Sequence, residues 1–411
     1  MSTSGKKATA TALAQKYAPQ IANKTVLVTG VSPNSLGATF VTAIAVASPA
    51  LLILAGRNAA KVEETTKAIQ AAAPHVPVRF LNLDLADRES VRKAAGEVLS
   101  WQDVPGIDVL VNNACLIGSE YKLIDGFEAH FVVNYLHPFL FTNLLLPKVI
   151  AVKGRVVNVA SDCHRWHHIR FSDLNFDVSV SWKISQRSAA RLQPRQNGKI
   201  YNMWQAYGQS KTANMLFSLA LARRLGGRGI VTNSVHPGII QTNAASHLDP
   251  AEILRLIAAE EVERQCGLAN QAFLSYKTVD EGTATHVYAA FEPGLKDHNG
   301  AYLLDSHVAD PVEDPVAPWG TSEADAEKLW RLITRRIPPS KSHIKGGKSK
   351  HLEANYYDQR LAPLLKRPDR SHPPDDFCRE IPPAAPKQDK KIVYINTHNA
   401  KRINLVNLNE A

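Results

Sequence analysis

The sequence has little cysteine: four residues among 411, with no paired or metal-type spacing. This scarcity excludes a disulfide-rich secreted scaffold and a cysteine-ligated zinc module, and it is typical of a reducing compartment. Long apolar runs are also missing. The amino terminus has no continuous apolar core of the kind that a signal peptide carries.

The longest apolar run, residues 131–150, is too interrupted for a membrane span. Five polar or helix-breaking residues divide it: Asn134, His137, Pro138, Asn143 and Pro147. Such residues are costly in lipid and suit a buried helix. We therefore expect a soluble, cytoplasmic protein without a transmembrane segment.

Acidic residues are outnumbered by basic ones, which gives a formal net charge of +10. Residues 338–411 hold 14 Lys and Arg against 8 Asp and Glu, together with nine of the 24 prolines. The segment has little helical or strand periodicity, so we expect a basic, Pro-rich and largely irregular C-terminal tail. Recruitment of nucleic acid or an acidic membrane surface stays an alternative, but without a recognisable binding module no specific nucleic-acid partner is expected.

Between about Lys24 and Ile337, apolar runs alternate with amphipathic helical patterns, which is typical of βαβ units. Seven runs are predicted to be buried strands: residues 25–30, 51–57, 76–85, 107–114, 154–161, 230–238 and 300–304. The sequence therefore predicts one α/β domain, residues 24–337, after an N-terminal extension, residues 1–23. Its expected fold is a doubly wound, Rossmann-type, seven-stranded parallel sheet with helices on both faces.

The stretch "AYGQSK", residues 206–211, places a phenol and an ammonium four residues apart on a predicted helix. Residues with this spacing share one helix face, so Tyr207 and Lys211 can address one small volume. A nearby cation is expected to lower the tyrosine pKa, which suits proton exchange with an alcohol or carbonyl. The alternative is an ordinary amphipathic helix whose tyrosine packs and whose lysine is solvated.

The first predicted strand runs into the loop "TGVSPNSLG" and then into a helix. Glycine at such a turn lets the backbone approach a pyrophosphate, and the helix amino terminus offers N–H groups and positive potential. Gly30 and Gly37 are present, but Asn34 and Ser35 stand where a middle glycine is expected. Asparagine tolerates the left-handed conformation, so the loop predicts a dinucleotide site of altered geometry. An ordinary strand–turn–helix is the alternative.

Three further predicted strands end in residues that suit a dinucleotide. Arg57 follows the second strand, where an arginine suits the 2′-phosphate of NADP and an acidic residue would suit the ribose of NAD. A solvated arginine is the alternative there. Asp84 is placed to touch the adenine edge, and Asn113 and Ala114 end the fourth strand at the ligand-binding edge. These residues predict NADP(H) as the cofactor.

Taken in order, the motifs resemble those of the short-chain dehydrogenase/reductase family, most of all its retinol-dehydrogenase-like branch. The likeness covers about residues 24–310. Besides the glycine-rich loop, these stretches carry it: "NNAC" at 112–115, "NYLHPF" at 134–139, "VVNVAS" at 156–161, "YGQSK" at 207–211 and "HPGIIQT" at 236–242. Two departures are the missing middle glycine and Cys115, which replaces the glycine of the family's "NNAG".

The resemblance implies a catalytic tetrad. In it Tyr207 exchanges a proton with the reacting oxygen, Lys211 lowers the tyrosine pKa and binds the nicotinamide ribose, Ser161 hydrogen-bonds the reacting oxygen, and Asn134 positions a water. Implied cofactor contacts come from Gly30, Ser32, Asn34, Ser35, Leu36, Gly37, Arg57, Asp84, Leu85, Asn113, Ala114, Tyr207, Lys211, Pro237, Gly238 and Thr242. It also implies a homodimer, because the helices predicted from residue 126 and around Tyr207 have apolar outer positions beyond what a sheet contact needs.

Two stretches are expected to border the substrate, about residues 162–203 and 243–280. The first begins within "SDCHRWHH", a cluster of cysteine and histidine that suits a pocket wall and solvated histidines better than zinc, which needs three or four convergent ligands. No metal is predicted.

The predicted function is an NADP-dependent oxidoreductase that interconverts an alcohol and a ketone or aldehyde on a small lipophilic molecule. The alternative is a catalytically weak nucleotide-sensing or scaffold protein on the same fold, motivated by Asn34 and Ser35 in the glycine-rich loop.

Overall fold

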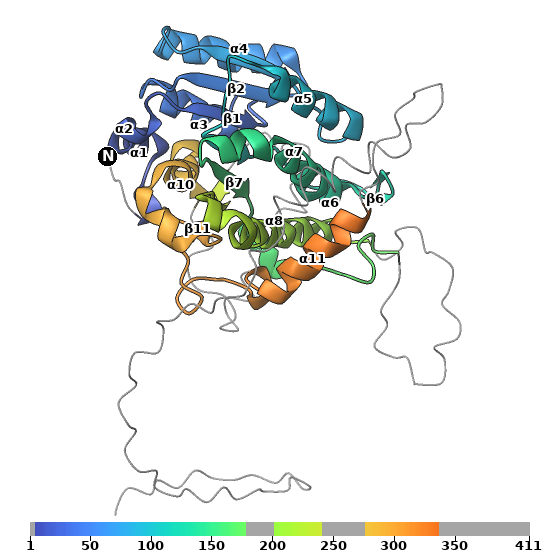
Figure 1. Cartoon of the computed structure of the whole chain (residues 1–411). Helices are drawn as coiled ribbons and strands as arrows, with labels where there is room; N and C mark the ends of the chain where they lie inside the picture. Colours follow the sequence, from blue (N-terminus) through green and yellow to red (C-terminus); the bar gives the residue numbers. More distant parts are fainter. Residues whose placement is uncertain (1–4, 178–200, 241–275, 337–411) are drawn as a thin grey trace, which may run out of the picture. The chain divides into compact units, whose positions relative to one another are not determined.

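A computed structural model describes residues 5–177, 201–240 and 276–336 (Figure 1). The predicted tail, most of the second substrate stretch and residues 178–200 of the first lie outside the described residues. The central sheet is built from β1 (Thr25–Thr29), β2 (Leu51–Gly56), β3 (Val78–Asn82), β4 (Val109–Asn112), β7 (Arg155–Val159), β8 (Val231–His236), β11 (Tyr302–Leu304) and β12 (His307–Val308).

The strand order is β12-β11-β8-β7-β4-β1-β2-β3. β1 lies between β2 and β4 and is parallel to both, with Val28 opposite Leu54 on one side and Val111 on the other. The chain therefore adds strands to one side of β1 first and then to the other. Ligands of such sheets bind where the order reverses, at the carboxyl ends of β1 and β4.

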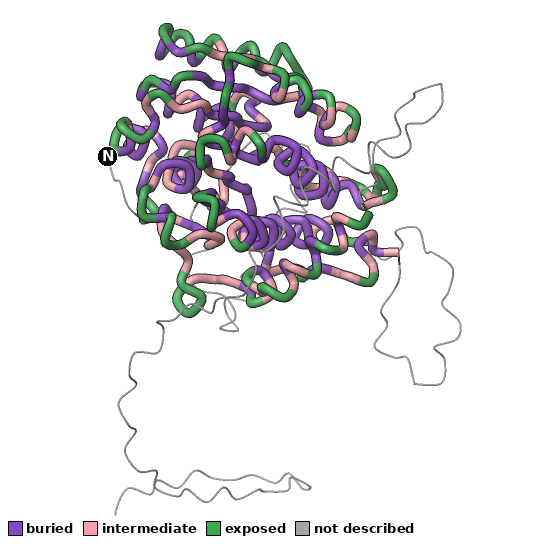
Figure 2. The backbone as a smooth tube through the Cα atoms, viewed as in Figure 1, coloured by how far each residue is buried: buried purple, intermediate pink, exposed green. Residues whose placement is uncertain are grey.

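Helices cover both faces of the sheet, and the two large clusters of buried hydrophobic residues lie on opposite faces (Figures 1 and 2). On one face lie α5 (Arg88–Ser100), α7 (His137–Ala151) and α8 (Met203–Leu225); on the other lie α3 (Leu36–Ala45), α4 (Ala59–Ala72) and α10 (Val279–Phe291). With both faces covered, the strands need continuous aliphatic residues. The predicted doubly wound fold is confirmed.

The sheet has one strand more than predicted. Seven strands are parallel, and β12 pairs antiparallel with β11, with Leu304 opposite His307. The connecting residues Asp305 and Ser306 both have positive φ, 49° and 60°. Hairpin turns with this backbone favour Asn and Gly, and without those residues the sequence carries a weak hairpin signal.

Within the stretch that the sequence predicts to be an N-terminal extension, residues 1–23, the described residues from Gly5 onward pack against the domain. They form α1 (Ala10–Lys16) and α2 (Ala18–Ile21), and α1 contacts α3 and α10. Leu13 is fully buried, and the Tyr17 hydroxyl donates to the Glu292 carboxylate at 2.6 Å. Small alanine side chains let α1 approach closely enough for these contacts.

The single helix predicted over residues 126–151 is divided into several elements in the structure. A short strand, β6 (Phe127–Glu128), leads into α6 (Ala129–Phe131), a π-helical turn, η2 (Val132–Leu136), and then α7. The strand pairs with β5 (Leu123–Ile124). Turns of the π type are rare and concentrate at functional sites, and this one contains Asn134.

A helix of the same chain, α11 (Glu323–Arg336), packs along α8 (Figure 1). The Trp330 ring centre lies 4.9 Å from that of Phe139 on α7 and 6.2 Å from that of Phe217 on α8. The apolar outer positions of these helices are therefore covered within the chain. The homodimer that the resemblance implies stays a prediction.

Across its described ranges, the chain forms no helix with the length and apolar character that a membrane crossing requires.

Candidate active site

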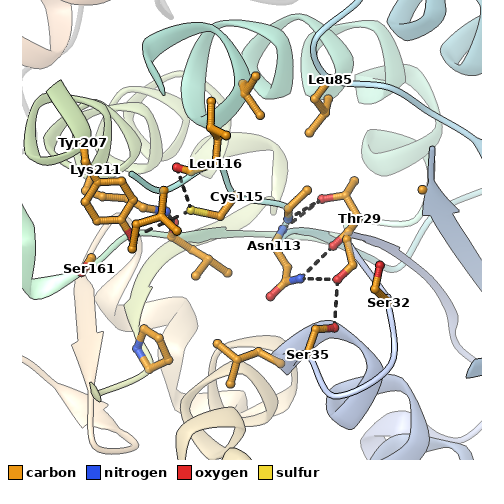
Figure 3. A pocket seen from close by; sticks show the side chains of 18 of the residues that line it. Thr29, Ser32, Ser35, Leu85, Asn113, Cys115, Leu116, Ser161, Tyr207 and Lys211 are labelled. Atoms are coloured by element: carbon orange, nitrogen blue, oxygen red, sulfur yellow. Dashed lines mark hydrogen bonds between the residues drawn. The ribbon is translucent and has the colours of Figure 1, made fainter. Parts of the chain in front are cut away.

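A cavity of about 920 Å³ opens at the carboxyl edge of the sheet (Figure 3). Its walls include most of the predicted site residues: Gly30, Ser32, Ser35, Leu36, Arg57, Asp84, Leu85, Asn113, Ala114, Ser161, Tyr207, Lys211, Pro237 and Gly238. Asn34, Gly37 and Asn134 are described but are not part of the wall, and Thr242 lies outside the described residues. The predicted cofactor and catalytic residues thus share one cavity.

The loop after β1 takes the conformation that a phosphate-binding turn needs. Gly30 has φ 73°, and a Cβ added to it would lie 2.7 Å from the Ala114 Cα. Asn34 has φ 59°, so an asparagine occupies the left-handed position in place of glycine, as the sequence predicts. Ser35 then caps α3, its Oγ accepting the Ala38 N–H at 3.1 Å.

Gly37 lets α3 begin directly against this loop. A Cβ there would lie 2.5 Å from the Gly30 carbonyl oxygen and 2.6 Å from Asn113 Nδ2. Asn113 closes the cradle, because its Nδ2 donates to the Thr29 and Gly30 carbonyl oxygens, each at 2.9 Å. The tight backbone and the free N–H groups of the first helical turn fit a pyrophosphate.

A second helix amino terminus borders the cavity next to Arg57. Asn58 caps α4 by accepting the Lys61 N–H at 3.1 Å, and Arg57, Asn58 and Lys61 all line the cavity. Two cations at a helix amino terminus suit a phosphate group. The sequence analysis missed Lys61, although its place three residues after the capping Asn58 was a usable signal.

The predicted catalytic residues Ser161, Tyr207 and Lys211 lie together at one end of the cavity, away from Ser32 and Ser35 (Figure 3). Tyr207 on α8 is 7% exposed, and Lys211, one turn later, is 2% exposed. The Lys211 ammonium donates to the Val159 carbonyl at 2.9 Å and lies 5.3 Å from the Tyr207 ring centre. Ser161 follows β7 and lines the same cavity.

The pKa of the Tyr207 hydroxyl lies well above its ordinary value. Burial is the largest cause, the neighbouring Cys115 and Cys163 side chains add to it, and the hydrogen bond with Ser161 acts in the opposite direction. Cys115 Sγ lies 3.8 Å from the hydroxyl oxygen. This direction corrects the expectation that Lys211 lowers the pKa: its ammonium lies over the ring and donates to the backbone, so burial dominates.

Asn134 holds the segment after β4 in place. Its Oδ1 accepts the Leu116 N–H at 2.7 Å, and its Nδ2 donates to the Leu116 carbonyl at 2.9 Å and to Ser210 Oγ at 3.0 Å. The side-chain amide thus joins the π-helical turn to the cavity wall and to α8. The water-positioning role that the resemblance implies stays a prediction.

Apolar side chains form the outer part of the cavity, and the sequence analysis named none of them individually. They include Leu116, Ile117, Ile124, Val133, Trp166, Trp204, Ile239 and Ile240. The Trp166 and Trp204 rings meet edge to face, with centres 5.9 Å apart. Trp204 precedes Tyr207 by three residues on α8, so helical spacing was an available signal.

The histidine cluster after Ser161 supports the backbone. His164 is fully buried, its Nδ1 donating to the Ser161 carbonyl at 2.8 Å and its Nε2 accepting the Ala317 N–H at 3.1 Å. Burial lowers the pKa of His164 to about 4, so the ring is neutral. Among residues 5–177, 201–240 and 276–336, no three His, Cys, Asp or Glu side chains are grouped as metal ligands.

Comparison with known proteins bears on the family of the chain. Residues 24–172 match the family model described as short chain dehydrogenase. The chain is 33% identical to retinol dehydrogenase 14 of Mus musculus over 321 residues, covering 75% of this chain and 84% of that protein. It is 33% identical to retinol dehydrogenase 12 of Bos taurus over 286 residues, covering 69% and 77%. A solved short-chain type dehydrogenase/reductase from Mycobacterium marinum aligns with TM-score 0.49 and 17% identity, covering 71% and 96%.

Fold and relatives together define an oxidoreductase that uses a nicotinamide cofactor to interconvert alcohol and carbonyl groups. The chain belongs to the short-chain dehydrogenase/reductase family, in its retinol-dehydrogenase-like branch.

Proposed function

We propose that the protein is an NADP-dependent oxidoreductase that interconverts an alcohol and a ketone or aldehyde on a small lipophilic molecule. The observation that carries the proposal is the meeting of Ser161, Tyr207 and Lys211 in the cavity that also holds the glycine-rich loop. Arg57 and Lys61 would hold the 2′-phosphate, and the loop after β1 the pyrophosphate. The bound cofactor supplies or accepts the hydride.

The chain's own residues handle the proton. With its pKa raised, Tyr207 is a protonated phenol near neutral pH, the form that donates a proton to a carbonyl oxygen. The Ser161 hydroxyl beside it can donate a hydrogen bond to the same oxygen. The buried Lys211 ammonium stabilises negative charge as the proton leaves. Tryptophan and aliphatic walls suit a lipophilic substrate.

Hydride transfer between NADPH and a panel of aldehydes and ketones tests the proposal. Turnover, followed as loss of reduced-nicotinamide absorbance, supports it. A protein that binds NADPH but turns over no member of the panel favours the nucleotide-sensing or scaffold alternative. The left-handed Asn34 weakens that alternative, because the loop keeps its turn without the middle glycine.

Cofactor preference is expected to depend on Arg57. Charge-assisted hydrogen bonds are worth about 1.5–3 kcal/mol, so Arg57→Glu is expected to raise the KM for NADPH about 10–100-fold. The KM for NADH should change little, because NADH has no 2′-phosphate. Lys67→Glu is the matched control, since it makes the same charge change on α4 outside the cavity. Equal losses for the two cofactors after Arg57→Glu would contradict the assignment.

A further inference from the structure

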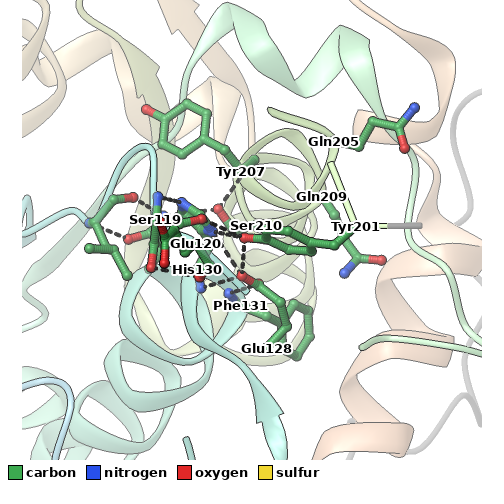
Figure 4. Close-up of polar contacts among 12 residues, drawn as sticks. Ser119, Glu120, Glu128, His130, Phe131, Tyr201, Gln205, Tyr207, Gln209 and Ser210 are labelled. Carbon is green, nitrogen blue, oxygen red and sulfur yellow. Dashed lines mark hydrogen bonds and ion pairs between the residues drawn. The ribbon is translucent and has the colours of Figure 1, made fainter. Parts of the chain in front are cut away.

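Close to Tyr207 lies a polar cluster formed by the buried Glu128 and His130 and the half-buried Tyr201 (Figure 4). The Glu128 carboxylate is fully buried and receives four hydrogen bonds. Two come from the backbone N–H groups of His130 and Phe131, at 3.0 and 2.9 Å. The others come from His130 Nδ1 at 2.8 Å and the Tyr201 hydroxyl at 3.0 Å.

These bonds keep the carboxylate charged. Burial acts to raise the pKa of Glu128, but the hydrogen bonds from His130 and from the backbone N–H groups act against it, and the pKa lies below its ordinary value. A charge buried in this way is retained only where its partners are fixed. The cluster is therefore rigid.

The two ring nitrogens of His130 have different partners. Nε2 lies 3.2 Å from the backbone nitrogen of Ser119, and a backbone N–H can only donate. Nε2 is therefore an acceptor, and the proton resides on Nδ1, which faces Glu128. His130 thus links the buried Glu128 carboxylate to the backbone of Ser119 through one hydrogen bond on each ring nitrogen.

Ser119 belongs to the cavity wall. We call residues 115–122 the wall segment, because Cys115, Leu116, Ile117, Ser119 and Lys122 line the cavity. The Tyr201 hydroxyl lies 3.0 Å from the Ser119 carbonyl as well as from Glu128, and these two acceptors share its single proton. Both backbone groups of Ser119 therefore face the cluster. Asn134 holds the same segment at Leu116.

The cluster also reaches the catalytic tyrosine. The His130 ring meets the Tyr207 ring edge to face, with centres 6.1 Å apart. Tyr201 directly precedes Asn202, the capping residue of α8, which carries Tyr207 and Lys211. One rigid unit therefore contacts the proton donor on one side and the wall segment on the other.

We propose that Glu128, His130 and Tyr201 are positioning residues that set the wall segment against Tyr207 and so fix where a substrate carbonyl lies. This inference rests on the carbonyl oxidoreduction proposed above. A displacement of about 1 Å is enough to lower the rate of an oriented reaction strongly. His130 touches both the wall segment and the proton donor, Tyr201 touches the wall segment, and Glu128 holds His130. The geometry therefore assigns them a role in substrate placement and none in cofactor binding.

Two substitutions of one residue separate this role from simple stability. The Asn side chain of His130→Asn can place its amide nitrogen near the position of Nδ1 and keep the bond to Glu128, but it loses the acceptor for Ser119. The longer side chain of His130→Gln can place its amide oxygen near the position of Nε2 and keep the Ser119 bond. Both variants lose the ring contact with Tyr207 equally.

We expect His130→Asn to have a kcat/KM for the carbonyl substrate about tenfold below that of His130→Gln, the effect of one hydrogen bond. The KM for NADPH should be the same in both. Tyr201→Phe, which keeps its ring against Tyr121 and Phe176, should resemble His130→Asn. Equal kcat/KM values for the two His130 variants, or a matching change in the KM for NADPH, would overturn the inference.

Amide hydrogen exchange over residues 115–122 of the full-length protein gives a second readout that needs no turnover. Exchange should be faster in His130→Asn than in His130→Gln, because the Ser119 anchor is lost. Equal exchange overturns the inference. If the wild-type protein shows no turnover but the two His130 variants still differ in exchange, the result counts against the proposed reaction. It would still establish that His130 anchors Ser119.

Discussion

Tyr207→Phe is expected to lower kcat for carbonyl reduction about 1,000-fold, within the range that a general acid contributes. The substitution removes one oxygen atom from a side chain that is 7% exposed and keeps the ring against His130. The hydroxyl has no backbone partner in the described residues that its loss would leave unsatisfied. Binding of NADPH should therefore change by less than about fivefold, because a side-chain hydrogen bond is worth about 1 kcal/mol.

Single-turnover hydride transfer and a separate NADPH titration measure the two effects independently. Tyr288→Phe is a suitable control, because this partly buried tyrosine lies on α10, on the opposite face of the sheet. It should leave the rate unchanged. Should Tyr207→Phe retain more than about a tenth of the rate, the phenol is not the proton donor.

The pH profile follows from the direction of the Tyr207 pKa. The phenol is protonated below its pKa, and burial places that pKa above the ordinary value of about 10. Proton donation should thus persist as the pH rises through the ordinary tyrosine range and fail only above it. A rate of carbonyl reduction that falls between pH 7 and 9 because Tyr207 loses its proton would contradict this prediction. Substrate binding measured over the same pH range serves as the control. If binding does not change with pH, the fall in rate comes from the proton transfer.

The features that the sequence predicted are those with a local signature. Buried parallel strands leave continuous aliphatic runs such as residues 51–55, because helices cover both faces of the sheet. The four-residue spacing placed Tyr207 and Lys211 on one face of α8 without any knowledge of the rest of the chain. Asn34 was recognised as a residue that can adopt positive φ, and it does.

The features that were missed depend on contacts between distant residues. The Tyr207 pKa is raised partly through Cys115, which is 92 positions away, and no helical spacing records that contact. Helix α1 joins the domain through bonds such as Thr11 N–H to Asp280 Oδ1 at 3.0 Å. Similarly, α11 covers surfaces whose apolar residues suggested a partner subunit. A local pattern reports which residues need burial but leaves open which part of the chain buries them.

Gly37→Ala is expected to destabilise the protein and weaken NADPH binding together. The new methyl group would lie 2.5 Å from the Gly30 oxygen and 2.6 Å from Asn113 Nδ2. Neither neighbour can move freely, because the Gly30 oxygen accepts hydrogen bonds from Asn113 Nδ2 at 2.9 Å and from Ser35 Oγ at 3.2 Å. Overpacking of this kind costs about 1–3 kcal/mol in the free energy of unfolding.

The same chemical change at Gly96 provides the control for this prediction. Gly96 is exposed within α5, and an added Cβ there meets no atom within 4 Å. Alanine is favoured over glycine inside a helix by about 1 kcal/mol, so Gly96→Ala should stabilise the protein and leave NADPH affinity unchanged. Gly37→Ala should instead lower the affinity for NADPH about tenfold or more. The reason is that it displaces the Gly30 backbone, which is the surface expected to meet the pyrophosphate. The loss of one hydrogen bond there already lowers the affinity about tenfold. Urea unfolding and NADPH titration of both variants measure the contrast. If the two glycines respond alike, the close approach of α3 to the loop is not what shapes the cofactor site.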